Sequence, residues 1–382
     1  VITSCVNEIL GSACLSLSLN PLMTQGQIEA LEAHGSADIQ STYLPNLTSG
    51  RWSGTMNLTE ECAGSDVGAL RTKAIPNDDG TFDISGQKIY ISWGEHDLTE
   101  NICHLVLARL PNSKRGTAGI SLFLVPKFIP CGNKVVGKRN NVTALSIEKK
   151  MGLHGSPTAV MEYKNAKGWI IGEPNGGMAA MFTMMNNARL GVGVQGVSQA
   201  ERAIQKATFF AKSRKQGKAI VKNGTGSILD HADVRRNILI MKALTFIARC
   251  ICLETAVSTD FSKVSGSKDY QAKAAFLTPI AKAFGTDIGC QVTDLGIQVH
   301  GGLGFIENAG ASQLYRDVRI TRIYEGTNGI QAMDLVNRKL SDGGRAAFKI
   351  IDDFTNVEKA CSNSNLFEND AIKDFKASCL DL

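Results

Sequence analysis

The sequence predicts an α+β protein in which a helical segment, a β-rich segment and a second helical segment follow one another. Apolar residues recur at helical spacing at both ends of the chain, and at alternate positions in between. The 382 residues suffice for two or three domains, and 43% hydrophobic with 20% charged residues is typical of a globular protein with a large core. We predict domains at residues 1–50, 51–168 and 169–382, the last an antiparallel four-helix bundle whose end is incomplete.

The N-terminal segment is predicted to be helical and to dock on a later part of the chain, because it cannot bury its faces alone. Polar residues at Asn7 and Glu8 interrupt the apolar run Val1–Leu19, so a buried core helix is favoured over a membrane span. We expect a break at Gln25–Gln27 and a short helix after it. The chain opens with Val inside the first helix, which suggests a fragment or a trimmed protein.

Alternating polar and apolar residues mark the strands of the central segment. The residues on either side of Ser85–Gln87 alternate in this way, which predicts a hairpin with its turn there. Further strands are expected at Leu105–Ala108, Ile120–Val125 and Ala159–Tyr163. The segment is therefore a compact, barrel-like β-domain.

Four helices are expected after Gly177. The first carries a stripe of small residues that begins at Arg189 and includes Gly193 and Gly196, so either a neighbouring helix or a ligand approaches it closely. Asp230 is expected to cap the second helix. The third runs from about Lys268 to Val299.

Charge and cysteine content exclude some classes of function. The net charge of +5 is too small and too dispersed for nucleic-acid binding, although it would suit phosphate-bearing ligands. The 10 cysteines lack the paired spacing of a zinc site, so we predict no metal site and reduced thiols.

The stretch Arg316–Gln331 contains a candidate catalytic acid. Glu325 lies between an aromatic residue and the turn Gly326–Gly329, and a fourth helix begins after it. Thr327 or Asn328 can cap that helix, with Ile330, Met333 and Val336 facing inward. A single carboxylate beside a helix N-terminus could act as a base next to a ligand, although most Glu-Gly pairs are solvent-exposed turns.

Several short motifs occur in order between about residues 50 and 340. They are Leu58–Asp66, Gly86–Ser92, Arg189, Ser213–Gly217, Gln298–Phe305, Tyr315–Asp317 and Tyr324–Thr327. Together they resemble the flavin-dependent acyl-CoA dehydrogenase family. The run Met151–Thr158 is similar to the longer-chain branch that includes 3-(methylthio)propanoyl-CoA dehydrogenases, whose members carry extra sequence at both ends.

The resemblance implies bound FAD. Thr59 and Ser92 match the family residues that form hydrogen bonds with the polar edge of the flavin ring. Tyr90 matches the residue that covers one face of the ring, and Ser65 matches a residue whose hydroxyl lies between the flavin and the thioester. Arg214 matches an arginine that pairs with flavin pyrophosphate across a subunit interface. The cofactor-binding residues implied are Thr59, Ser65, Tyr90, Ser92, Arg214, Gln298, Gly301, Gly302, Thr327 and Asn328.

The resemblance also implies α,β-dehydrogenation of an acyl-CoA thioester to the trans-2-enoyl-CoA. Glu325 would remove the α-proton while flavin N5 takes the β-hydride. Some branches place the base immediately before the CoA-contacting arginine, but here that residue is Ala188. The best guess for the substrate is 3-(methylthio)propanoyl-CoA or a short or medium acyl-CoA. The substrate-binding residues implied are Ser65, Asn186, Arg189 and Gly326.

Partners and alternatives complete the expectations. The family resemblance implies an electron-transfer flavoprotein as acceptor, a homodimer or homotetramer, and a cytoplasmic location or the mitochondrial matrix in a eukaryote, with no nucleic-acid or membrane partner. An acyl-CoA oxidase that uses oxygen and a flavin-bound, DNA-associated alkylation-response protein remain alternatives. Two departures from the family pattern occur near the flavin: Glu61–Cys62 replaces a proline and its neighbour, and Trp93 is expected to narrow access.

Overall fold

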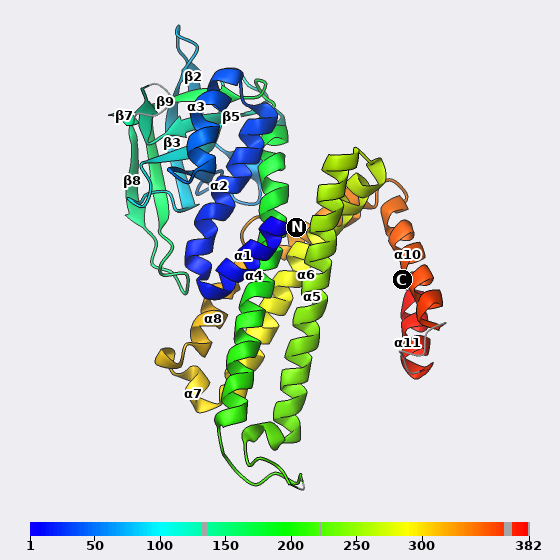
Figure 1. Ribbon diagram of the computed structural model, residues 1–382. Helices are drawn as coiled ribbons and strands as arrows, with labels where there is room; N and C mark the ends of the chain where they lie inside the picture. The colour runs from blue at the N-terminus through cyan, green and yellow to red at the C-terminus, as the bar shows by residue number, and fades with distance from the viewer. Residues whose placement is uncertain (132–135, 222, 363–368, 381–382) are drawn as a thin grey trace.

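The computed structural model describes residues 1–131, 136–221, 223–362 and 369–380, and it confirms the predicted fold class (Figure 1). Helices form both ends of the chain, and a sheet lies between them. The helices are α1 (Ile2–Ala13), α2 (Leu15–His34), α3 (Ala37–Thr48), α4 (Gly177–Ser213), α5 (Ala232–Ser265), α6 (Lys268–His300), α7 (Gly302–Phe305), α8 (Ala311–Val318), α9 (Asn328–Asp334), α10 (Arg345–Ser362) and α11 (Asn369–Leu380). The strands are β1 (Trp52–Asn57), β2 (Lys73–Pro76), β3 (Phe82–Ser92), β4 (Asn101–Arg109), β5 (Ile120–Pro126), β6 (Phe128–Pro130), β7 (Val136–Arg139), β8 (Val142–Ile147) and β9 (Thr158–Ile171).

The strand pairings close into a ring. β4 pairs with β5, β5 with β9, β9 with β3, β3 with β2, and β2 again with β4. β1 adds to β4 in parallel, and β8 adds to β9. Closing the ring leaves few free strand edges in this part of the chain, so most backbone groups of these strands are paired within it.

The hairpin predicted at Ser85–Gln87 is wrong. β3 is one strand through this segment, and it pairs with β9 along its length, with a shift of register between Ile84 and Gly86. Gly86 has a φ of 155°, and a Cβ there would lie 2.5 Å from the hydroxyl of Thr72. The glycine therefore serves a bulge that presses against a neighbouring loop rather than a turn.

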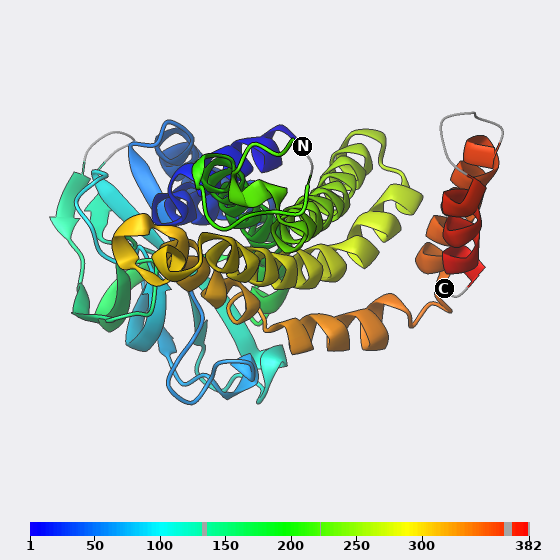
Figure 2. The same ribbon diagram turned by 90° about the horizontal axis from the view of Figure 1, so that it is seen from below.

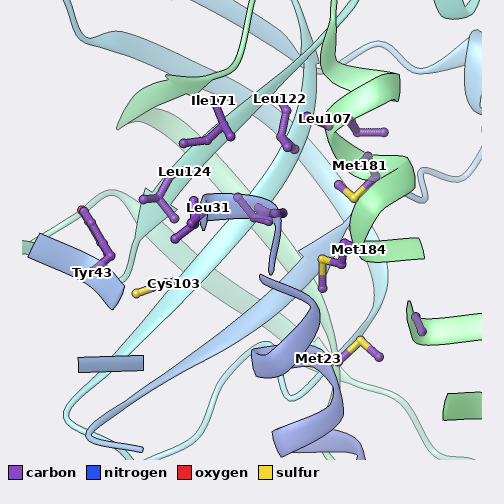
Figure 3. Close-up of a cluster of buried hydrophobic side chains, with 14 of the residues drawn as sticks. Met23, Leu31, Tyr43, Cys103, Leu107, Leu122, Leu124, Ile171, Met181 and Met184 are labelled. Carbon is purple, nitrogen blue, oxygen red and sulfur yellow. The ribbon is translucent and has the colours of Figure 1, made fainter. Parts of the chain in front are cut away.

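Helices α2 and α3 cover one face of the sheet and pack with α4 on a shared apolar core (Figure 3). The break expected at Gln25–Gln27 is absent, because α2 continues to His34. Gly26 lies inside α2, where a Cβ would be 2.8 Å from Met184 Cγ of α4. The buried helix expected over Val1–Leu19 is confirmed only in its second part: Leu15 and Leu19 of α2 are buried, whereas α1 buries only Gly11.

Three long helices, α4, α5 and α6, lie side by side below the sheet (Figure 1). The small residues of α4 face α6. A Cβ on Gly193 would lie 2.6 Å from the carbonyl oxygen of Ala281, and one on Gly196 would lie 2.1 Å from that of Gly285. Of the two partners considered for this stripe, the neighbouring helix is therefore the one that occupies it.

Two details of the helix termini differ from the prediction. Asp230 does not cap α5; it accepts a hydrogen bond from the backbone N–H of Gly226 in the preceding turn. Thr327 does cap α9, where its Oγ1 accepts from the backbone N–H of Ile330 at 3.2 Å. However, α9 has only 7 residues and continues into a π-helical turn, so Met333 and Val336 are exposed rather than inward-facing.

The last two helices, α10 and α11, stand apart from the three long ones (Figure 2). Ion pairs join α10 to α6, from Lys273 to Asp353 and from Lys349 to Asp269. Within the described ranges, no helix is long and apolar enough to cross a membrane, and the cysteines described up to residue 290 are free thiols.

Candidate functional site

A cavity of about 650 Å³ lies between the sheet, helix α4 and the turn that precedes α9. Segments far apart in the sequence form its walls: the loop after β1, the end of β3, the first turns of α4 and the segment Ile320–Ile330. The structure thus brings most of the predicted site residues together. Those that line the cavity are Thr59, Ser65, Tyr90, Ser92, Arg189, Glu325, Gly326 and Thr327.

One wall of the cavity offers free hydroxyl groups. Among the residues that the structure describes, the side chains of Thr59, Ser65 and Ser92 have no hydrogen-bond partner, although all three line the cavity. Tyr90 beside them has a φ of 61°, and the residue is 62% exposed. A bulky residue in the left-handed region is strained, and such strain is typical of functional sites.

A buried ion pair supports this wall from behind. Lys88 Nζ donates to Glu60 Oε1 at 2.8 Å and to the carbonyl oxygen of Leu58 at 2.9 Å. The Glu60 carboxylate also accepts from the backbone N–H groups of Arg71 and Thr72. The loop that carries Thr59 and Ser65 is therefore fixed to β3. The sequence did not predict the burial or the pairing of Lys88 and Glu60.

Glu325 lies in a strained turn at the opposite wall. It has a φ of 57°, and Gly326 after it has a φ of 82°. Gln331 donates from Nε2 to the carbonyl oxygens of Glu325 and Gly326, at 3.2 and 3.1 Å. Burial raises the pKa of the Glu325 carboxyl to about 7, although Arg189 and Lys282 oppose the rise. The group can therefore exchange a proton near neutral pH.

Arg189 is buried rather than exposed to solvent. Its Nη1 donates to Asp334 Oδ2 at 2.9 Å, and its side chain is only 4% exposed. Its Nε is buried and has no hydrogen-bond partner among the described residues. Asp334 also pairs with Arg338, whose guanidinium lies over the ring of Phe182 and lines the cavity.

Some predicted site residues lie outside the cavity. Asn328 directs its side chain to α6 instead, and Asn186 is exposed on α4 and does not line the cavity. Arg214 follows the end of α4, 25 residues beyond Arg189, which corresponds to roughly 37 Å along the helix. The residues that share the distant end of the bundle with it are Gln298, Gly301 and Gly302.

Trp93 does not narrow the cavity. Its indole N–H donates to the carbonyl oxygen of Ser16 at 3.1 Å, and its ring packs with Leu19 and Leu153. The side chain therefore fixes the start of α2 to the end of β3. The expectation of restricted access at this position is wrong.

Two further contributors were missed by sequence reasoning. Lys282 of α6 is fully buried, and its Nζ donates to Asn328 Oδ1 at 2.9 Å. The sequence shows only a lysine among apolar and small residues of a helix. That pattern is equally compatible with a lysine exposed to solvent at the side of the helix. Methionines also line the cavity, namely Met23, Met56, Met178 and Met185.

Comparison with known proteins assigns the family. Residues 55–166 match the model of the acyl-CoA dehydrogenase middle domain, and residues 175–340 match that of the C-terminal domain. The chain belongs to the acyl-CoA dehydrogenase family. Acyl-CoA dehydrogenases are FAD-dependent flavoproteins, so FAD is the cofactor of the family to which this chain belongs.

Individual relatives agree with the family models. The chain is 48% identical over 353 residues to a 3-methylmercaptopropionyl-CoA dehydrogenase of Ruegeria pomeroyi, covering 91% of this chain and 60% of the relative. It is 31% identical to a short-chain-specific acyl-CoA dehydrogenase of Megasphaera elsdenii, covering 84% of this chain and 74% of the relative. The solved structure of butyryl-CoA dehydrogenase from Megasphaera elsdenii matches with a TM-score of 0.73 and 26% identity, covering 87% of this chain and 80% of that one. The chain spans 50% to 60% of the length of the first four curated relatives.

Proposed function

We propose that this protein is an FAD-dependent acyl-CoA dehydrogenase that oxidises the α,β-bond of an acyl-CoA thioester to the trans-2-enoyl-CoA. Glu325 removes the α-proton. The observation that carries this assignment is the pKa of Glu325, which burial raises to about 7 at an apolar cavity wall. A carboxylate base works best when its pKa lies near the operating pH, because it is then both available and strong enough.

The residues that line the cavity suit a flavin. The free hydroxyls of Thr59 and Ser92 can bond the polar edge of a flat ring, and the exposed Tyr90 side chain can cover one of its faces. Bound FAD supplies the acceptor for the β-hydrogen. Ser65 and Gly326 leave room for the thioester beside Glu325, and Arg189 lines the same cavity, where its guanidinium can contact the CoA part of the substrate.

For the substrate we propose 3-(methylthio)propanoyl-CoA or another short or medium acyl-CoA. The Ruegeria pomeroyi relative bears the name of an enzyme for that thioether-containing acyl group. Four methionine side chains belong to the apolar lining of the cavity, and their unbranched, polarisable thioethers adapt to an acyl chain that itself contains sulfur.

For the assembly we propose a homodimer or homotetramer with an electron-transfer flavoprotein as acceptor, located in the cytoplasm or, in a eukaryote, in the mitochondrial matrix. Arg214 and the glycines at 301 and 302 are exposed at the far end of the bundle, where they can reach the cofactor of a neighbouring subunit. The bundle end also carries exposed apolar side chains, Phe209 and Phe305 among them.

A panel of acyl-CoA thioesters with a dye acceptor tests the proposal. We expect one or more thioesters to bleach the flavin, and the variant Glu325→Gln to retain flavin without bleaching. Glu32→Gln, at an exposed position of α2, is the matched control and should behave as the unmodified protein. If no thioester reduces the flavin, or if Glu325→Gln is bleached normally, the assignment fails.

The same panel separates the alternatives. Hydrogen peroxide formed without an added acceptor would indicate an acyl-CoA oxidase. Salt-dependent DNA binding would favour the alkylation-response class. Purified protein with a single bound flavin is sufficient for all of these measurements.

A further inference from the structure

Lys282 is a charged side chain in the interior of the helical region. Its side chain is fully buried on α6, and within the part of the chain that the structure describes its ammonium group makes one hydrogen bond, to Asn328 Oδ1 at 2.9 Å. An ammonium group has three donors, and burying it costs several kcal/mol unless other groups compensate. The position therefore requires an explanation beyond packing.

The amide of Asn328 connects Lys282 to the turn that carries Glu325. While its Oδ1 accepts from Lys282, its Nδ2 donates to Thr286 Oγ1 at 3.1 Å and to the carbonyl oxygen of Ala283 at 3.3 Å. Asn328 is the first residue of α9 and follows Glu325 by three positions. On the other side, Gln331 holds the carbonyl groups of Glu325 and Gly326. The turn is thus fixed from both sides, and α6 provides one of them.

The charges around Lys282 and Glu325 come from several elements. Arg189 of α4 and Lys282 of α6 both favour the ionised form of Glu325. Arg322, from the segment before the turn, and Asp287 of α6 act on Lys282 in opposite directions. Burial lowers the pKa of Lys282 to about 8, while Glu325 opposes that shift. Arg189 has the larger effect of the two on Glu325, although Asp334 pairs with it, and Lys282 adds a second positive charge from α6.

We propose that Lys282 is a positioning residue for the base: it holds the turn Glu325–Asn328 through the Asn328 amide, and its charge favours the ionised, proton-accepting form of the Glu325 carboxyl. This inference rests on the proposed function for its catalytic meaning. Lys282 does not line the cavity and so does not touch the substrate.

The variant Lys282→Gln removes the charge and keeps a hydrogen-bond donor at the position, on a side chain one bond shorter than lysine. Loss of a nearby positive charge shifts a carboxyl pKa upward by about one unit or more. We expect the acid limb of the kcat/KM profile to move up by about one pH unit, so that activity at pH 6 falls roughly tenfold while activity at pH 8.5 changes little. Lys282→Arg should restore the profile.

A second measurement does not depend on turnover. Infrared difference spectra of the flavin-bound protein follow the protonated carboxyl band of Glu325 against pH, with Glu325→Gln to assign the band. We expect its midpoint to be higher in Lys282→Gln than in the unmodified protein. Lys273→Met, which removes a paired lysine from the same helix far from the turn, should leave the midpoint in place.

The two measurements distinguish the failure of each idea. An unchanged infrared midpoint in folded Lys282→Gln would overturn the role of Lys282, whether or not thioesters are oxidised. A shifted midpoint in a protein that oxidises no thioester would overturn the proposed function and leave the electrostatic role standing. If Lys282→Gln does not fold, the variants Lys282→Arg and Asn328→Ala test the hydrogen bond between Lys282 and Asn328 instead. Full activity of Asn328→Ala would refute the role of this hydrogen bond in holding the turn.

Discussion

The buried pair Lys88–Glu60 makes a strong prediction for stability. Lys88 is 0% exposed and Glu60 is 8% exposed at their side chains, and Glu60 retains three donors besides the lysine, from Arg71 and from the N–H and hydroxyl of Thr72. Replacing Lys88 with methionine removes the cation but keeps the bulk of the side chain. The Glu60 carboxylate then stays buried without its countercharge.

The size of the effect follows from the balance of burial and attraction. Burial lowers the pKa of Lys88 to about 8 although Glu60 raises it, so desolvation of the lysine outweighs the attraction between the partners. Breaking such a pair costs about 3–5 kcal/mol, whereas removing both charges costs much less. We therefore expect Lys88→Met to lower the free energy of unfolding by about 3–5 kcal/mol, and Glu60→Gln added to it to restore about 1–3 kcal/mol. The recovery is partial because the N–H of Arg71 donates to Oε2 of Glu60 and that of Thr72 donates to Oε1, and a glutamine keeps an acceptor at only one of these positions.

Urea unfolding followed by tryptophan fluorescence measures both variants, because Trp52, Trp93 and Trp169 all lie in the β-rich region. Lys164→Met is the matched control: Lys164 pairs with Glu162 on the surface of the same region, with 75% of its side chain exposed. That pair should contribute less than about 1 kcal/mol. If Lys88→Met costs no more than Lys164→Met, or if Glu60→Gln only adds to the loss, the buried charges do not compensate each other in this way.

Three further outcomes are expected. Gly196→Val should destabilise the protein by about 3 kcal/mol in urea unfolding, because its Cβ would lie 2.1 Å from the carbonyl oxygen of Gly285; an effect below about 1 kcal/mol would contradict the close helix contact. The pKa of Glu325 rises from 4.5 to about 7 on folding, so its contribution to stability is present below pH 4.5 and is lost as the pH rises through 7. The stability of Glu325→Gln relative to the unmodified protein should therefore increase by at most about 3 kcal/mol between pH 5 and pH 8. If the difference between the urea midpoints of the two proteins is the same at both pH values, this expectation is refuted. Tyr90→Gly should relieve about 1 kcal/mol of left-handed backbone strain in the flavin-free protein. The same variant should bind flavin more weakly in a fluorescence titration, and an unchanged flavin affinity would exclude Tyr90 from the site.

Local signals in the sequence predicted much of the architecture. The order of helices, strands and helices follows from apolar periodicity, and the start of α9 follows from a capping side chain at Thr327 that bonds Ile330. These features depend on residues within one turn or one strand of each other. That is why reading the chain in order sufficed for them.

Glycines were the main source of error. Gly26 and Gly86 were both interpreted as breaks, yet Gly26 lies in the middle of α2 and Gly86 in the middle of β3. Each makes room for a distant part of the chain, Met184 in the first case and Thr72 in the second. A glycine that accommodates a tertiary neighbour cannot be distinguished locally from one that ends an element.

The buried lysines were missed for a related reason. The register of β3 against β9 shifts between Lys88 and Ile91, so both residues face inward although strict alternation would place them on opposite faces. Counting back from Ile91 places Lys88 on the outer face, and this count fails at the bulge, which depends on pairing with β9. Lys282 likewise becomes buried only when the turn before α9 folds back onto α6.

The small-residue stripe of α4 connects the packing of the bundle to the candidate site. The sequence indicated close approach along this stripe, and the structure assigns it to α6 at Gly193 and Ala281. Lys282 follows Ala281 directly, and Arg189 precedes Gly193 by about one turn of α4. The glycine contact therefore sets the spacing at which two positive charges from different helices flank the Glu325 turn. A side chain at residue 193 would push α6 away and weaken both effects together, so the packing of this helix pair and the ionisation of the proposed base depend on the same contact.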